Sequence, residues 1–354
     1  MTEQENHTLG ISLNQGTSLL FGHEEQIKFL LDSIKRMQIP NAWLFHGPMG
    51  IGKASLAWNV AKVLSNIDFS KKDCVVGISE EDIRGPKTNI NINNIFICKR
   101  RWDNKKKLFQ KYISIDDIRE LKKKFSLTST DNSYKVCIVD TTEDLNLSAS
   151  NSLLKILEEP PKNTLFILVS NNQLSILPTI LSRCQRVGFQ RLHKKDLRDI
   201  YESFKKENQF DQIKDTSALN SCGGSVRKLL NFLDKDYIKT FNNMRKLFLD
   251  LPDLNKKKAI TILAENKDYL VSNDPDKSAF GILLRLLSSL AKKEIVLNAD
   301  TENVDDDITL VAAHLYAQIS LLRHQSLEYN VESKKVIFLA LNTIEAAFAK
   351  HKKE

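Results

Sequence analysis

The chain has 354 residues, of which 42% are hydrophobic and 27% charged, so it has the composition of an ordinary globular protein with room for two or three domains. No apolar run approaches the roughly 20 residues of a membrane span, and the polar, acidic N-terminus fits neither a secretory signal nor a transit peptide. We therefore expect a cytoplasmic protein without membrane contact. The net charge of +8 has the sign expected of a protein that works near nucleic acid.

A phosphate-binding loop is the first motif along the chain. An amphipathic helix is expected over 23–37 and a short buried strand over 42–46, and a further helix is expected over 55–64. The loop between that strand and the second helix satisfies the pattern G-x-x-x-x-G-K, whose backbone N–H groups and lysine cradle phosphates. The residues that would hold a nucleotide here are Gly47, Gly50, Gly52 and Lys53.

The residue after this lysine departs from the motif. Ala54 stands where a serine or threonine hydroxyl would hold Mg²⁺. Ser55 supplies a hydroxyl one position later, which is a rotation of about 100° on a helix and points it away from the metal. Ser55 is therefore kept only as a member of a degenerate nucleotide site, and hydrolysis by this chain alone is not expected.

The acid that would organise Mg²⁺ is Asp140, which closes a β-branched apolar strand expected over 134–140. Thr141 follows, where an enzyme that hydrolyses ATP usually has a glutamate. Glu143 lies past the end of the strand and is not expected to replace that glutamate. ATP or ADP bound without hydrolysis and an empty loop both remain open.

The other expected elements give the fold class. Strands alternate with helices up to about Leu192, which predicts an α/β domain with a parallel sheet and helices on both faces. Residues 66–112 carry little pattern beyond one hairpin, and the chain after Leu192 is entirely helical. We predict an α/β domain over 1–192, a small helical domain over 193–240 and an all-α domain over 241–354. The remaining expected helices are 115–121, 149–159, 194–206, 226–233, 278–293, 308–329 and 334–351, and the remaining expected strands are 164–169 and 185–189.

Two side-chain patterns each allow two interpretations. The basic runs 99–107, 122–124 and 350–353 are typical of solvated surface, although Trp102 and Phe109 flank charges in the first run as residues that stack on nucleic acid would. Arg183 lies between an expected helix and an expected strand. It either pairs with a carboxylate of its own domain or projects toward the γ-phosphate of a neighbour.

A set of motifs then resembles one family closely. The runs Asn151–Pro161, Leu177–Ile180 and Ser182–Cys184, with the phosphate loop, Asp140 and Gly224–Arg227, are similar to the clamp-loader branch of the AAA+ ATPases over about residues 20–235. The resemblance implies that Arg183 is an arginine finger acting in trans and that Arg227 senses bound nucleotide. It also implies that 193–240 is a lid and 241–354 a collar that oligomerises.

Within this branch, Asn41–Pro48 is most similar to delta-prime subunits of bacterial DNA polymerase III. That resemblance implies a scaffold without ATPase activity of its own, in a ring with gamma or tau and delta subunits that loads the sliding clamp on primed DNA. Many relatives carry a four-cysteine zinc module, but here the corresponding interval holds only Cys74 and Cys98, so we predict no zinc and no other metal. The alternatives are a gamma-like ATPase that tolerates Ala54 and a DNA-binding AAA+ factor.

Overall fold

The computed structural model divides at Ile200 into two compact units, and the short segment Gly224–Val226 belongs to the first. None of the described helices is long and apolar enough to cross a membrane. The predicted three-domain division is not tested by this split and stays a prediction. The residues that the structure describes are 20–71, 75–85, 93–103, 108–126, 133–208, 222–232, 234–265, 278–292, 305–329 and 331–351.

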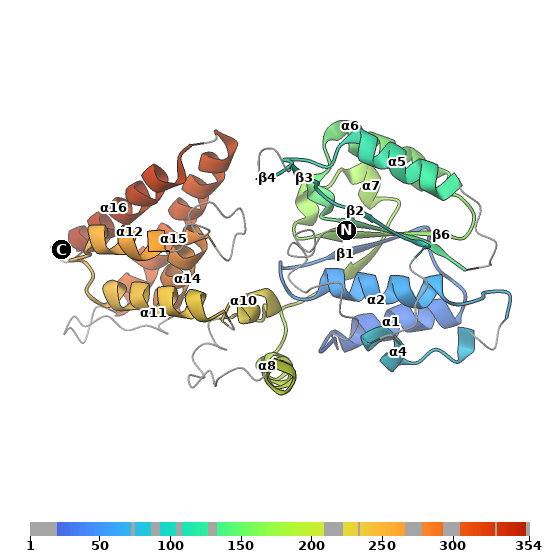
Figure 1. Ribbon diagram of the computed structural model, residues 1–354, viewed down its shortest axis with the longest axis horizontal. Helices are drawn as coiled ribbons and strands as arrows, with labels where there is room; N and C mark the ends of the chain where they lie inside the picture. The colour runs from blue at the N-terminus through green and yellow to red at the C-terminus, as the bar shows by residue number, and fades with distance from the viewer. Residues whose placement is uncertain are drawn as a thin grey trace. The chain divides into compact units, whose positions relative to one another are not determined.

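The first unit is built on a five-stranded sheet in the order β2-β5-β6-β1-β7 (Figure 1). Every neighbouring pair of strands runs parallel, as predicted. The phosphate loop follows β1 and the candidate aspartate ends β5, so both lie at the carboxyl edge of the sheet. The strands are β1 (Ala42–His46), β2 (Ile95–Cys98), β5 (Lys135–Asp140), β6 (Thr164–Ser170) and β7 (Gln185–Gly188).

Helices cover both faces of this sheet (Figure 1). Trp43 and Phe45 of β1 belong to the core on the α1, α2 and α4 side, whereas Leu44 belongs to the core on the α5, α6 and α7 side. A strand that is buried on both faces must be apolar at successive positions, which explains why β1, β5 and β6 read as continuous hydrophobic runs. These helices are α1 (Glu24–Lys35), α2 (Lys53–Ser65), α4 (Glu80–Arg84), α5 (Ile115–Ser126), α6 (Leu147–Glu158) and α7 (Pro178–Leu181), with 3-10 turns η2 (Thr142–Asp144) and η3 (Gln173–Ser175). The chain continues in α8 (Lys194–Asn208), which crosses the division between the two units.

The region 66–112 is more regular than the sequence analysis predicted. The expected hairpin is present as β3 (Trp102–Asp103) and β4 (Leu108–Phe109). The edge strand β2 and the helix α4 were not expected. Polar residues before β2 make its start hard to predict from the sequence. One of them, Asn94, is buried and donates a side-chain hydrogen bond to Ser133 Oγ at 2.8 Å.

The second unit is helical, as predicted. Its helix α14 is buried along almost its whole length and lies against α15. The leucines at positions 283, 286, 287 and 290 are buried there. The helices of this unit are α10 (Val226–Asn231), α11 (Lys235–Leu249), α12 (Lys256–Glu265), α14 (Ala279–Ala291), α15 (Asp305–Glu328) and α16 (Ser333–His351).

Candidate functional site

The loop from β1 to α2 has the backbone of a phosphate-binding loop. Gly47, Gly50 and Gly52 have φ of 151°, 76° and 104°, a region that favours glycine. A Cβ on Gly47 would lie 2.3 Å from the backbone oxygen of Phe189, so only glycine fits there. Gly52 caps α2 without a side-chain hydrogen bond, which leaves first-turn N–H groups of that helix for an anion.

Two polar side chains brace this loop, and the sequence analysis did not select the first of them, His23. His23 Nε2 donates to the backbone oxygen of Ile51 at 2.8 Å. The hydroxyl of Ser225 donates to the backbone oxygen of Gly50 at 3.2 Å. Ser225 belongs to the predicted Gly-Ser-x-Arg motif, so part of that motif contacts the loop directly.

Lys53 is the only charged residue that the motif contributes, and it is 3% exposed. Its ammonium donates to the backbone oxygens of Gly47 at 2.8 Å and Pro48 at 2.5 Å, and to Asn171 Oδ1 at 3.0 Å. These three hydrogen bonds use all three donors of the group. The sequence offered one signal for Asn171, because it is the first residue after the buried strand β6, at the edge where Asp140 ends β5.

The acids at this edge differ in part from the prediction. Asp140 ends β5 as expected, and its charge acts on Lys53. Glu143 also turns toward the loop: its Oε1 accepts the backbone N–H of Asn171 at 2.7 Å, and its charge affects Lys53 more than that of Asp140 does. Glu143 Oε2 is buried and accepts no hydrogen bond from the described residues.

Lys53 gives this site a pH dependence. Burial, partly offset by the charges of Glu143 and Asp140, lowers the pKa of Lys53 from 10.5 to about 8. A lysine with a lowered folded pKa costs stability at neutral pH, and this cost fades as pH rises above the folded pKa toward the unfolded one. Relative to Lys53→Met, we expect the wild type to gain about 2 kcal/mol of unfolding free energy between about pH 7 and pH 9.5. Urea unfolding across this range measures it, and parallel profiles would contradict the assignment.

The other motif positions stand as follows. Ala54 and Ser55 are half-buried in the first turn of α2. Thr141 follows β5 directly, so no acid stands at that position. Arg227 is the second residue of α10 and belongs to the second unit, whereas the loop belongs to the first. The role of Arg227 as a nucleotide sensor therefore stays a prediction.

Arg183 follows α7 and precedes β7, at the surface of the first unit. Its Nη2 lies 2.7 Å from Glu158 Oε1 at the end of α6, in the kind of internal carboxylate pair that the sequence left open. Its Nη1 donates to the backbone oxygen of Thr179 at 2.9 Å and to Ser182 Oγ at 3.3 Å. The Arg183 side chain is nevertheless 36% exposed, so internal pairing does not remove it from the surface.

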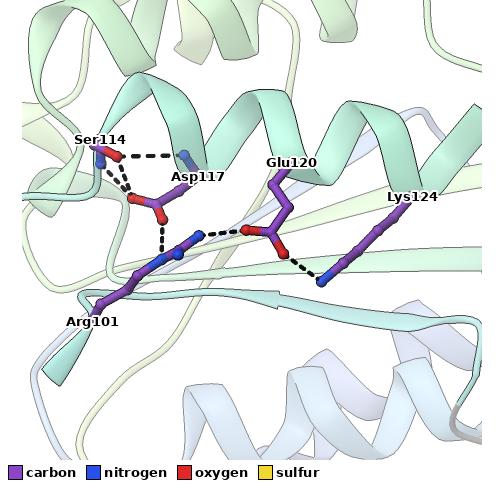
Figure 2. A network of polar contacts seen from close by, with 5 residues as sticks. All are labelled: Arg101, Ser114, Asp117, Glu120 and Lys124. Atoms are coloured by element: carbon purple, nitrogen blue, oxygen red, sulfur yellow. Dashed lines mark hydrogen bonds and ion pairs between the residues drawn. The ribbon is translucent and has the colours of Figure 1, made fainter.

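Two arginines of the first basic run are paired within their own domain, and Figure 2 shows the contacts of one of them, Arg101. Arg101 forms ion pairs with Asp117 and, at 2.6 Å, with Glu120 of α5, and Arg100 pairs with Asp144 at 3.0 Å. Trp102, in strand β3 of the hairpin, is half-exposed, while residues 104–107 lie outside the described part of the chain. Two arginines that are already neutralised weaken the case for a nucleic-acid surface here.

Zinc ligation receives no support from the described residues, in which no cluster of three metal-ligating side chains occurs. Burial and nearby Asp117 raise the pKa of the Cys98 thiol to about 12, although Arg101 opposes this. Cys74 lies outside the described residues. The absence of a zinc module stays a prediction.

Comparison with known proteins finds similarity to subunits of DNA polymerase III. A family model described as "DNA polymerase III, delta subunit" matches residues 22–193. The chain is similar to the tau subunit of Bacillus subtilis (29% identity, 60% of this chain and 36% of that protein) and to the delta' subunit of the same organism (31%, 49% and 49%). It is also similar to the gamma subunit of Buchnera aphidicola (26%, 78% and 72%).

The matched regions thus span about a third of tau and half of delta'. The gamma, tau and delta' subunits match this chain at similar identities, between 26% and 31%. These identities do not distinguish a delta' subunit from a gamma or tau subunit. These matches show that the chain is similar to the gamma, tau and delta' subunits of DNA polymerase III.

Proposed function

We propose that this chain is a delta-prime type of clamp-loader subunit, which acts as a scaffold and donates an arginine finger to its neighbour. The observation that carries the proposal is Arg183, a half-exposed guanidinium held at the domain surface by three hydrogen bonds. A guanidinium that reaches a γ-phosphate in trans stabilises the charge of the transition state. The site it would complete belongs to an adjacent gamma or tau subunit, in a ring that also contains delta and acts on the sliding clamp and primed DNA.

The chain's own loop fits the phosphates of a nucleotide better than it fits hydrolysis. A bound ATP would bring a phosphate tail for the amides of the loop and for Lys53. Because all three donors of Lys53 are used, a phosphate oxygen would have to take the place of Asn171 Oδ1. Ala54 offers no ligand to Mg²⁺ and Thr141 is no general base, so the residues present hold phosphates without the parts that hydrolysis needs.

The helical unit offers surface to neighbours. Leu310 and Leu321 of α15 are 71% and 59% exposed, and their separation of eleven residues puts them on one face of that helix. Phe338 and Leu339 of α16 are about half exposed. Large apolar side chains that gather on one exposed face are typical of a surface that another subunit covers, so the shared face of Leu310 and Leu321 supports the proposed collar.

ATP turnover by the isolated chain distinguishes a scaffold from an active ATPase. We expect no ATP turnover above that of Lys53→Ala, because neither the Mg²⁺ hydroxyl nor the glutamate after Asp140 is present. Phosphate release is measured with the purified chain alone and with gamma or tau added. Turnover by the isolated chain that Lys53→Ala abolishes would replace the scaffold with a gamma-like ATPase.

One observation favours that second candidate. Glu143 faces the loop with a buried carboxylate oxygen that no described residue satisfies, as a water-polarising acid would. If the isolated chain hydrolyses ATP, Glu143→Gln should remove the activity as fully as Lys53→Ala does. If it does not hydrolyse ATP, Glu143 is a structural acceptor for the Asn171 N–H.

A further inference from the structure

Glu158 contacts the proposed finger from a different part of the chain. It is the last residue of α6, twenty-five positions before Arg183, and its Oε1 lies 2.7 Å from Arg183 Nη2. The next residue, Glu159, has no contact with Arg183 among the described residues. One of two consecutive glutamates is therefore paired with the arginine, and the other serves as a natural comparison.

The contacts leave part of the guanidinium open. Of its five N–H donors, the two on Nη1 go to Thr179 O and Ser182 Oγ, and one on Nη2 goes to Glu158. The Nε–H and the second Nη2–H make no hydrogen bond to any described residue. Two donors on neighbouring nitrogens match the spacing of two phosphate oxygens.

The pair contributes little to the stability of the fold. Both side chains are substantially exposed, at 36% and 48%, and exposed ion pairs are screened by water and salt. What the pair does change is the freedom of a long side chain, because the backbone and hydroxyl acceptors fix Nη1 while Glu158 fixes Nη2. An arginine that is ordered before its target arrives loses less conformational freedom when it binds.

We propose that Glu158 is a positioning residue for Arg183, which holds the guanidinium and leaves its Nε–H and one Nη2–H unbonded for the phosphate of a neighbouring subunit. This inference rests on the proposed function, since it gives Arg183 a target in trans. Glu158 touches no nucleotide in this arrangement. It acts only through the arginine.

The test uses the full chain assembled with delta and with gamma or tau subunits, in a ring whose other phosphate loops carry a lysine-to-alanine change so that only the site beside this chain turns over ATP. It compares Glu158→Ala with Glu159→Ala. We expect Glu158→Ala to lower the maximal ATPase rate about three- to tenfold, with the KM for ATP unchanged, because the finger acts in the transition state. Glu159→Ala removes the same charge one residue later and should leave the rate within about twofold of wild type. Glu158→Gln keeps an oxygen acceptor for Nη2 and should recover most of the lost rate.

A second measurement does not depend on ATP. In the free subunit, NMR of the arginine Nε–H groups should show faster motion of Arg183 in Glu158→Ala than in wild type or Glu159→Ala. Unchanged motion, or an equal loss of rate in both alanine variants, would overturn the positioning role. If Arg183→Ala itself leaves the rate of the assembled loader unchanged, the proposed function fails, whatever the NMR of Glu158→Ala shows.

Discussion

Arg183→Ala is expected to lower the ATPase of the site next to this subunit by about 10³-fold or more. An arginine finger is worth about 10³–10⁵ in rate because it meets charge that develops only in the transition state. Arg183 is held by two exposed acceptors, Glu158 and Ser182, and by one backbone oxygen, so its removal leaves no buried charge behind. Folding and assembly should therefore be unchanged.

The ring must be prepared so that this single site is visible. The gamma or tau subunits at the other positions carry a lysine-to-alanine change in their own phosphate loops, so turnover comes only from the site beside this chain. In such a ring the rate reports directly on Arg183. In an unmodified ring, total turnover would fall only by the share of that one site.

Two matched variants test whether the effect depends on the position and donor geometry of Arg183 or only on its positive charge. Arg186 is an exposed arginine three residues later on β7, and Arg186→Ala should leave the rate close to wild type. Arg183→Lys keeps the positive charge but loses the planar fork of donors, and it should recover only a small part of the activity. If Arg183→Ala and Arg186→Ala have equal effects, the lost activity is a general effect of surface charge and Arg183 has no special role.

The sheet could be predicted from the sequence because its central strands are apolar on both faces. Strands β1, β5 and β6 are continuous hydrophobic runs with a polar residue at or just after their carboxyl ends, and this pattern placed both Lys53 and Asp140 at one edge. Edge strand β2 has half-buried residues and buried Asn94 before it, so its pattern is weak. An edge strand forms because it pairs with a neighbouring strand, and the local sequence pattern holds no information about that partner.

The side-chain partners at the site could be predicted far less well. Asn171 and Glu143 reach the phosphate loop from segments more than 85 residues away along the chain, and only the sheet brings them together. The partner of Arg183 was left open for the same reason, since any of several carboxylates satisfies the pattern. The motifs predicted which single residues have a chemical role. They did not predict hydrogen bonds between distant segments, because these depend on the order of the strands in the sheet.

Substitution of a glycine in the phosphate loop is expected to have the second large effect, a loss of unfolding free energy. Gly47→Ala should lower the free energy of unfolding of the first unit by about 2–6 kcal/mol, which combines the strain of a positive φ with overpacking. The added Cβ would lie 2.3 Å from the backbone oxygen of Phe189. A backbone atom cannot rotate away from this clash as a flexible side chain could. Gly52→Ala is the matched control, because its φ of 104° is also positive but its nearest neighbour is Leu20 Cδ1 at 3.7 Å.

Gly52→Ala should therefore cost only the backbone strain, about 1–3 kcal/mol. The two variants are compared by urea unfolding, followed by a signal from the first unit, with Lys53→Ala as a reference that alters the loop without changing its backbone. A larger loss for Gly47→Ala than for Gly52→Ala means that the loop packs against the strand end at Phe189 in solution. Equal losses would mean that the loop rests away from this strand end, and the fixed cradle for phosphates inferred from its backbone would then not exist in the free protein.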